Sequence, residues 1–128
     1  YAGPYGISKF AAVAATEALA ADLALSGSAI KVTALCPGMV ATDIAVGSER
    51  HRPAELATAV TDDQAFVNEV LVDVTAQGID PADVAGMVVD AVRAETFLLL
   101  THPHHAAALG ERAAQLATGA LPERGDFT

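Results

Sequence analysis

The sequence predicts an α/β layered fold built on a parallel sheet. Two short apolar segments, 30–36 and 97–101, have the composition of strands, and helix-forming segments precede, separate and follow them. Phe97-Leu98-Leu99-Leu100 is an unbroken apolar run too short for a helix, which is typical of a strand buried in a parallel sheet. Two strands joined by a crossover make no stable parallel sheet alone. We therefore expect part of the sheet to be missing from the chain.

The first helix is expected over residues 8–25, with Ser8 as its N-cap and Ser26-Gly27 as its stop. Many of the 29 alanines of the chain lie all round this helix. Such a helix suits a sheet on one side and another helix on the other. The strand over residues 30–36 follows and ends at Pro37-Gly38.

The middle of the chain, residues 39–76, begins as an irregular stretch without a steady hydrophobic period. Thr61 and Gln64 then have the spacing of a capping box, which opens a helix that runs to about Ala76 and is stopped by Gly78. The sequence therefore predicts a long loop followed by a helix.

A stronger start signal comes next, with Asp80 as N-cap and Pro81 at the first helical position, and it predicts a helix over residues 80–94. After the strand at 97–101, an alanine-rich segment predicts a last helix over residues 103–117.

Charge and composition exclude several classes of function. With 7 basic and 16 acidic residues the net charge is −9, which repels phosphate backbones and anionic lipids. Nucleic acid and membrane surfaces are therefore not expected partners. The single cysteine, Cys36, excludes an internal disulfide and suits a reducing compartment, so we expect a cytoplasmic protein. At the end of a strand, Cys36 is read as a buried small hydrophobe and not as a nucleophile.

Tyr5 and Lys9 are the residues best suited to chemistry. They lie four positions apart at the start of the first helix, so their side chains share one face. A free tyrosine has a pKa of about 10, too high for ready proton exchange at neutral pH. An ammonium roughly 5 Å away, at an effective dielectric of about 20, favours the phenolate by about 3 kcal/mol. The pair therefore predicts a general acid/base, although the spacing alone is common in unrelated chains.

The residues around this pair resemble the active-site helix of the short-chain dehydrogenases/reductases. The segment Tyr5-Gly6-Ile7-Ser8-Lys9-Phe10-Ala11-Ala12 has the family's serine before the lysine and its small residues after it. Leu35-Cys36-Pro37-Gly38-Met39-Val40-Ala41-Thr42 is similar to the family's strand followed by a Pro-Gly-x-Val-x-Thr loop. The resemblance continues past residue 100. It implies the C-terminal half of one domain over residues 1–128, the C-terminal part of a doubly wound, Rossmann-like sheet whose dinucleotide-binding half is missing.

The resemblance implies an NAD(P)-dependent oxidoreductase that interconverts an alcohol and a ketone or aldehyde by hydride transfer. Tyr5 then exchanges the proton, and Lys9 also holds the ribose hydroxyls of the nicotinamide nucleotide. The remaining residues implied in cofactor binding follow the first strand: Pro37, Gly38, Val40 (through its backbone) and Thr42. NAD and NADP both remain open. Family members commonly pair through the first helix, so a homodimer or homotetramer is expected.

Two parts of the family's machinery lie upstream of Tyr5 and are absent, namely the catalytic serine and the Gly-rich turn that seats the pyrophosphate. The chain alone is therefore expected to be inactive. One alternative is a non-catalytic or truncated module for dimerisation or ligand sensing. Epimerases and dehydratases with the same Tyr and Lys are another, although the Pro-Gly loop resembles the single-domain reductases more.

The histidines are weaker candidates. His102, His104 and His105 surround Pro103, but no Cys, Asp or Glu lies close in sequence, so we expect a helix N-terminus and no metal. His51 is read as a solvated loop residue.

The family's substrate loop corresponds here to residues 39–76. This region offers mainly apolar side chains and few fixed polar groups, which favours an apolar or mixed substrate. The apolar residues that support this expectation are Ile44, Val46, Leu56, Phe66 and Val67.

Overall fold

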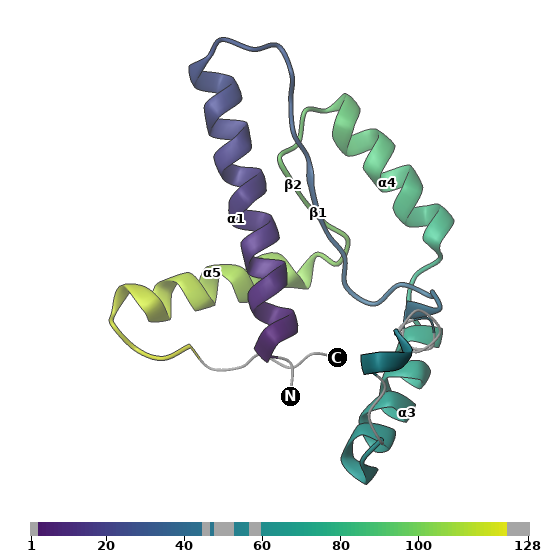
Figure 1. Cartoon of the computed structure of the whole chain (residues 1–128). Coiled ribbons are helices and arrows are strands. Elements are labelled where there is room, and N and C mark those ends of the chain that lie inside the picture. The colour runs from purple at the N-terminus through teal and green to yellow at the C-terminus, as the bar shows by residue number, and fades with distance from the viewer. Residues whose placement is uncertain (1–2, 45–46, 48–52, 57–59, 123–128) are drawn as a thin grey trace. The chain divides into compact units, whose positions relative to one another are not determined.

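A computed structural model of the protein describes residues 3–44, 47, 53–56 and 60–122 (Figure 1). The chain divides into two compact units. We call Tyr1–Pro37 with Ala91–Thr128 the strand unit, and Gly38–Asp90 the loop unit. The elements are, in chain order, α1 (Gly3–Leu25), β1 (Ala34–Cys36), the 3-10 helix η1 (Ala54–Leu56), α3 (Asp62–Ala76), α4 (Pro81–Arg93), β2 (Leu98–Leu100) and α5 (His104–Ala117).

The two strands pair in parallel, which confirms the α/β class with a parallel sheet. Ala34 lies opposite Leu98 and Cys36 opposite Leu100. Because β1 and β2 are parallel, their carboxyl ends meet at one edge of the sheet. Both strands are shorter than the predicted 30–36 and 97–101. The strands pair no earlier because the segment before β2 is a turn, in which Glu95 has a φ of 53°.

Helix α1 begins five residues earlier than predicted, at Gly3. Ser8 is therefore not an N-cap: it lies inside the helix, and its Oγ donates a hydrogen bond to the carbonyl of Tyr5 at 2.7 Å. Pro4 sits in the first turn, where a missing N–H leaves no helical hydrogen bond unmade. The predicted start at Ser8 is wrong because Pro4 already favours the first turn of a helix.

The end of α1 is the one expected. Gly27 adopts a φ of 69°, a left-handed conformation that glycine takes without strain. The N–H of Ser28 donates to the carbonyl of Leu23 at 2.9 Å, and the N–H of Gly27 donates to Ala24 at 3.1 Å. These two bonds form a Schellman motif, which satisfies the last carbonyls of the helix.

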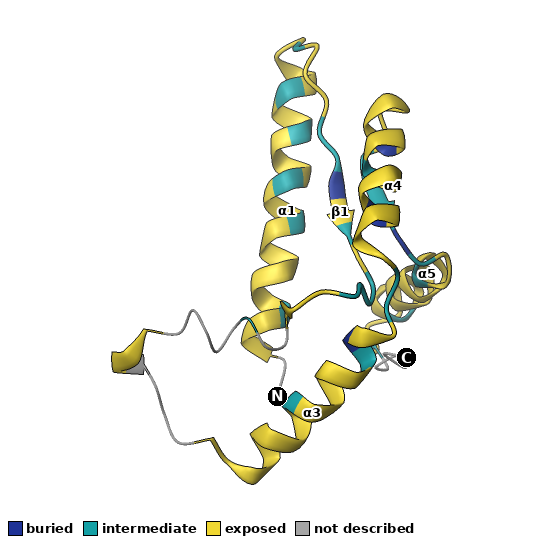
Figure 2. Ribbon diagram, turned by 90° about the vertical axis from the view of Figure 1, so that its right-hand side faces the viewer, coloured by how far each residue is buried: buried dark blue, intermediate teal, exposed yellow. Residues whose placement is uncertain are grey.

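The apolar core of the described residues is thin. Ala34 and Ala91 in the strand unit and Val84 in the loop unit each expose 7% of their surface. Helix α1 has no buried residue, although Val13, Thr16, Ala20 and Leu23 form a half-buried stripe at helical spacing (Figure 2). The expectation that α1 is covered on two sides is therefore not met.

A long-range contact joins the last helix to the first. The guanidinium carbon of Arg112 on α5 lies 4.9 Å from the ring centroid of Phe10 on α1, a cation–π arrangement. Within the described residues, no helix combines the length and apolarity that a membrane crossing needs.

In the loop unit, both predicted helix starts are formed. The Thr61 hydroxyl accepts from the Gln64 N–H at 3.3 Å, and the Gln64 side-chain oxygen accepts from the Thr61 N–H at 3.1 Å, which completes the capping box of α3. Asp80 Oδ1 accepts from the Ala82 N–H at 2.7 Å and so caps α4.

Candidate active site

Tyr5 and Lys9 lie together on the first turns of α1. The Lys9 Nζ sits over the Tyr5 ring, 5.1 Å from its centroid. Both side chains are exposed, and Tyr5 presents 60% of its surface to solvent. The four-residue spacing brings them onto one face because successive helical residues turn by about 100°. The arrangement puts the Lys9 ammonium beside the ring of an accessible phenol.

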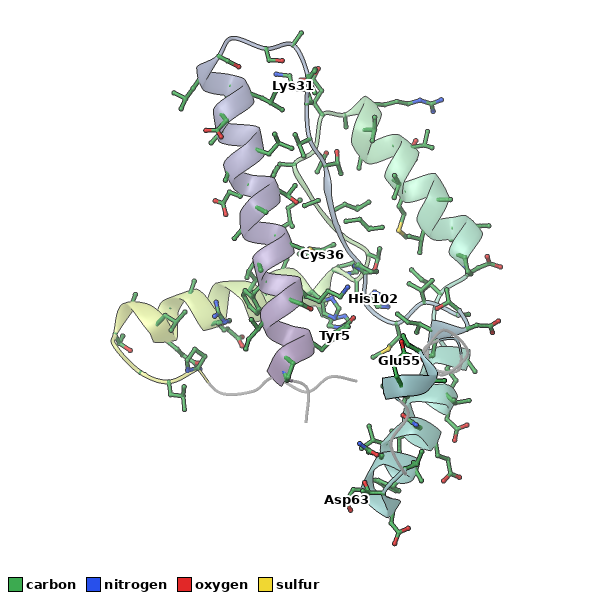
Figure 3. All side chains as sticks on the ribbon, in the orientation of Figure 1. Tyr5, Lys31, Cys36, Glu55, Asp63 and His102 are labelled. Carbon is green, nitrogen blue, oxygen red and sulfur yellow. The ribbon has the colours of Figure 1, made fainter. Side chains whose placement is uncertain are left out.

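This pair lies at the end of the strand unit where both strands finish. Figure 3 shows Tyr5, Cys36 and His102 toward one end of the strand unit, whereas Lys31 lies toward the other end. The three residues come from α1, from the last position of β1 and from the segment directly after β2. Open α/β sheets bind their ligands at the carboxyl ends of their strands, so this is the edge at which a site is expected.

Three histidines follow β2 at this same edge. The ring centroids of His104 and His105 are 4.4 Å apart. The ring centroid of His102 lies 5.7 Å from that of His104 and 5.3 Å from that of His105. Thr101 Oγ1 and His102 Nδ1 are 2.8 Å apart, within hydrogen-bond distance. Burial lowers the pKa of His105 below its ordinary value, and the neighbouring imidazoles of His104 and His102 lower it further. Among the described residues, no group of three or more possible ligands is arranged to hold a metal ion.

The sequence analysis does not place these histidines at the carboxyl edge of the sheet. The available signal was their position, because residues that directly follow a parallel strand emerge at its carboxyl end. Cys36, expected to be buried, is half-buried at the same edge.

The residues expected to meet the cofactor divide between the two units. Pro37 directly follows β1 in the strand unit, and Gly38 begins the loop unit. In the loop unit, Val40 forms an isolated parallel bridge with Ile79, and Thr42 is exposed.

The bridge consists of two hydrogen bonds. The Ile79 N–H donates to the Met39 carbonyl at 3.1 Å, and the Ala41 N–H donates to the Ile79 carbonyl at 2.9 Å. In a parallel bridge of this kind the N–H and C=O of the residue between the two bonded ones, here Val40, point away from the partner strand. The bridge to Ile79 therefore uses neither the N–H nor the C=O of Val40.

Several residues of the predicted substrate-loop region are accessible. Ile44, Phe66 and Val67 expose 64%, 67% and 37% of their surface. His51 and Val46 lie outside the described residues, and for Leu56 only the backbone is described.

Comparison with known proteins agrees with this architecture. Residues 1–53 match the short chain dehydrogenase family. A protein named CLA biosynthesis dehydrogenase/reductase, from Lactiplantibacillus plantarum, is 32% identical to this chain in an alignment that covers 93% of this chain and 43% of the relative.

The fold is similar to a solved structure as well. The crystal structure of a short chain dehydrogenase/reductase from Burkholderia phymatum in complex with NAD matches with a TM-score of 0.87 and 31% identity, over 97% of this chain and 45% of that one. The chain thus spans less than half the length of these relatives. By sequence and by fold, it belongs to the short-chain dehydrogenase/reductase family.

Proposed function

We propose that the chain is the C-terminal half of a single Rossmann-like domain in an NAD(P)-dependent oxidoreductase, one that interconverts an alcohol and a ketone or aldehyde. The observation that carries the proposal is the Lys9 ammonium over the ring of the exposed Tyr5, at the carboxyl edge of a parallel sheet. Family membership supports oxidoreductase chemistry, and the NAD bound to the Burkholderia phymatum protein supports a nicotinamide dinucleotide.

The residues present fit such a cofactor. A primary carboxamide, which the nicotinamide ring carries, needs one hydrogen-bond acceptor and one donor. The C=O and N–H of Val40, both directed away from Ile79, offer that pair. Thr42, two residues later, is an exposed residue with a hydroxyl in its side chain. Lys9 carries three N–H donors that suit ribose hydroxyls.

The proton chemistry belongs to Tyr5. In the reduction, the Tyr5 hydroxyl donates its proton to the carbonyl oxygen of the substrate as that carbon accepts hydride, so an alcohol is formed. In the oxidation, the Tyr5 oxygen accepts the proton of the alcohol. The bound nicotinamide supplies or accepts the hydride. Lys9 stabilises the phenolate that Tyr5 becomes when it has lost its proton.

The proposed substrate is a small alcohol or carbonyl compound with an apolar or mixed body. The exposed Ile44, Phe66 and Val67 in the substrate-loop region support this choice. We also propose that the enzyme is cytoplasmic and forms a homodimer or homotetramer through α1. On this helix Ile7, Phe10 and Leu25 expose 73%, 60% and 87% of their surface, which is ample apolar area for a second copy.

The test is an activity screen of the complete protein. Secondary alcohols with NAD or NADP, and ketones with the reduced cofactors, are followed by the absorbance of the reduced nicotinamide. The proposal predicts turnover with uncharged or mixed substrates. Lys9→Ala is expected to weaken cofactor binding as well as turnover, and Lys31→Ala, which removes a lysine at the opposite end of the strand unit, is expected to leave both unchanged. Nicotinamide binding without any turnover would instead support the ligand-sensing module.

A further inference from the structure

Gly78 lies very close to the backbone of the segment that follows β1. A Cβ built on it would lie 2.6 Å from the carbonyl carbon of Met39 and 2.7 Å from both the Met39 oxygen and the Val40 carbonyl carbon. All three atoms belong to the backbone, so no side-chain rotation relieves the contact. Any larger residue at position 78 must push the Met39–Val40 backbone away.

The same short segment forms the bridge to the loop after β1. Ile79, next to Gly78, provides both hydrogen bonds to the backbone at Met39 and Ala41. Because these bonds use only the side of the strand that faces Ile79, they fix the direction in which the Val40 N–H and C=O point. The approach at Gly78 brings the two backbones close enough for the bridge to form.

Gly78 and Ile79 are themselves anchored to α3. The Gly78 N–H donates to the carbonyl of Thr75 at 3.0 Å, and Thr75, in the last turn of α3, exposes only 4% of its surface. Directly after Ile79, the Asp80 side chain caps α4. The segment is therefore held at both sides by helix ends, and these contacts link the last turn of α3 to the bridge at Val40.

We infer that Gly78 and Ile79 are positioning residues for the nicotinamide ring: they aim the backbone of Val40 at the carboxamide and tie that aim to α3. The inference rests on the proposed function, in which Val40 meets the carboxamide. In this arrangement the C-terminal end of α3, in the substrate-loop region, helps to orient the nicotinamide ring. The positioning by Gly78 and Ile79 concerns only the nicotinamide end of the cofactor, because the Val40 backbone binds the carboxamide and no other part of it.

The experiment compares Gly78→Ala with Gly86→Ala in the complete protein. Gly86 is the matched control, since it lies inside α4 in the same unit and a Cβ there meets nothing within 4 Å. Two ligands are titrated, NADH (or NADPH, if the wild type prefers it) and ADP-ribose, which lacks the nicotinamide ring. Gly78→Ala is expected to weaken binding of the reduced dinucleotide about ten-fold, the effect of losing well-aligned hydrogen bonds. ADP-ribose binding is expected to change less than about two-fold, because no hydrogen bond is lost there.

Turnover supplies a further readout. A displacement approaching 1 Å at a positioned ring lowers kcat by about 10- to 100-fold, and Gly86→Ala is expected to keep the wild-type kcat. Equal weakening of the dinucleotide and of ADP-ribose by Gly78→Ala would show general damage to the fold and overturn the inference. Wild-type affinity and kcat in Gly78→Ala would overturn it too.

Hydrogen exchange of the wild type provides a test that needs no variant. NADH is expected to slow exchange of the Val40 N–H, and ADP-ribose is expected to leave it unchanged. Protection by both ligands, or by neither, contradicts the inference. A wild type that binds neither NADH nor NADPH would instead refute the proposed function, so the two failures are distinguishable.

Discussion

Replacing Lys9 with Met removes the ammonium and keeps an unbranched side chain of similar length. At saturating cofactor, where weaker ribose binding is compensated, it reports the effect of the charge on the chemical step. The Lys9 Nζ lies 5.1 Å from the centroid of the Tyr5 ring. Unit charges at about that separation attract by about 0.8 kcal/mol in bulk water and by about 3 kcal/mol at an effective dielectric of about 20. These energies correspond to about 4-fold and about 200-fold in rate.

The exposure of Tyr5 decides which value applies. Tyr5 exposes 60% of its surface, so water screens the pair when no ligand is bound, and the attraction is then about 0.8 kcal/mol. A bound cofactor and substrate would exclude water from the pair, which moves the interaction toward the larger energy. We therefore predict that kcat/KM for the substrate, measured at saturating cofactor, falls by between about 4-fold and about 200-fold in Lys9→Met of the complete protein.

The assay measures kcat/KM for Lys9→Met, Lys9→Arg and Lys31→Met beside the wild type. Lys9→Arg keeps the positive charge and is expected to retain more activity than Lys9→Met. Lys31 pairs with Glu95 at 3.7 Å on an exposed surface, and its loss is expected to have no effect on rate. The reasoning is refuted if Lys9→Met has wild-type kcat/KM, or if Lys9→Arg loses as much as Lys9→Met.

Two further predictions concern stability. Thr61→Ala removes the hydroxyl that accepts from the Gln64 N–H, and we expect it to lower the stability of α3 by about 1 kcal/mol. Hydrogen-exchange protection across α3 should fall in Thr61→Ala and be restored in Thr61→Ser. Unchanged protection in Thr61→Ala would contradict this. Because the pKa of His105 is lowered by burial and by His104 and His102, the unfolded chain binds a proton more readily there, so the free energy of unfolding should fall as the pH drops below about 6.5. His105→Gln should reduce that fall in denaturant titrations of the complete protein, and an identical fall in the variant would exclude His105 as its source.

Local signals in the sequence were sufficient for much of the fold. The capping box at Thr61, the N-cap at Asp80 and the stop at Gly27 depend on residues within one or two turns, and each is formed as predicted. The start of α1 was misplaced because Ser8 is a good capping residue in isolation, whereas Pro4 already fits the first turn of a helix.

The parts that could not be predicted depend on distant contacts. Gly78 was interpreted only as a helix stop, because its approach to Met39 joins positions far apart in the chain. The strands are short because strand length depends on paired neighbours, and the segment opposite residues 30–32 is a turn. Likewise, the place of His102 at the edge shared with Tyr5 follows from parallel pairing, which a search for metal-ligand spacing does not examine.

The proposed chemistry depends on proton transfer by the Tyr5 hydroxyl, and Tyr5→Phe removes this hydroxyl while it keeps the ring. The measurement is the single-turnover rate of hydride transfer in the complete protein, with cofactor affinity determined on the same samples. We predict a rate at least about 100-fold below that of the wild type, with cofactor affinity changed by no more than a few-fold. A Tyr5→Phe variant that transfers hydride at the wild-type rate would contradict it.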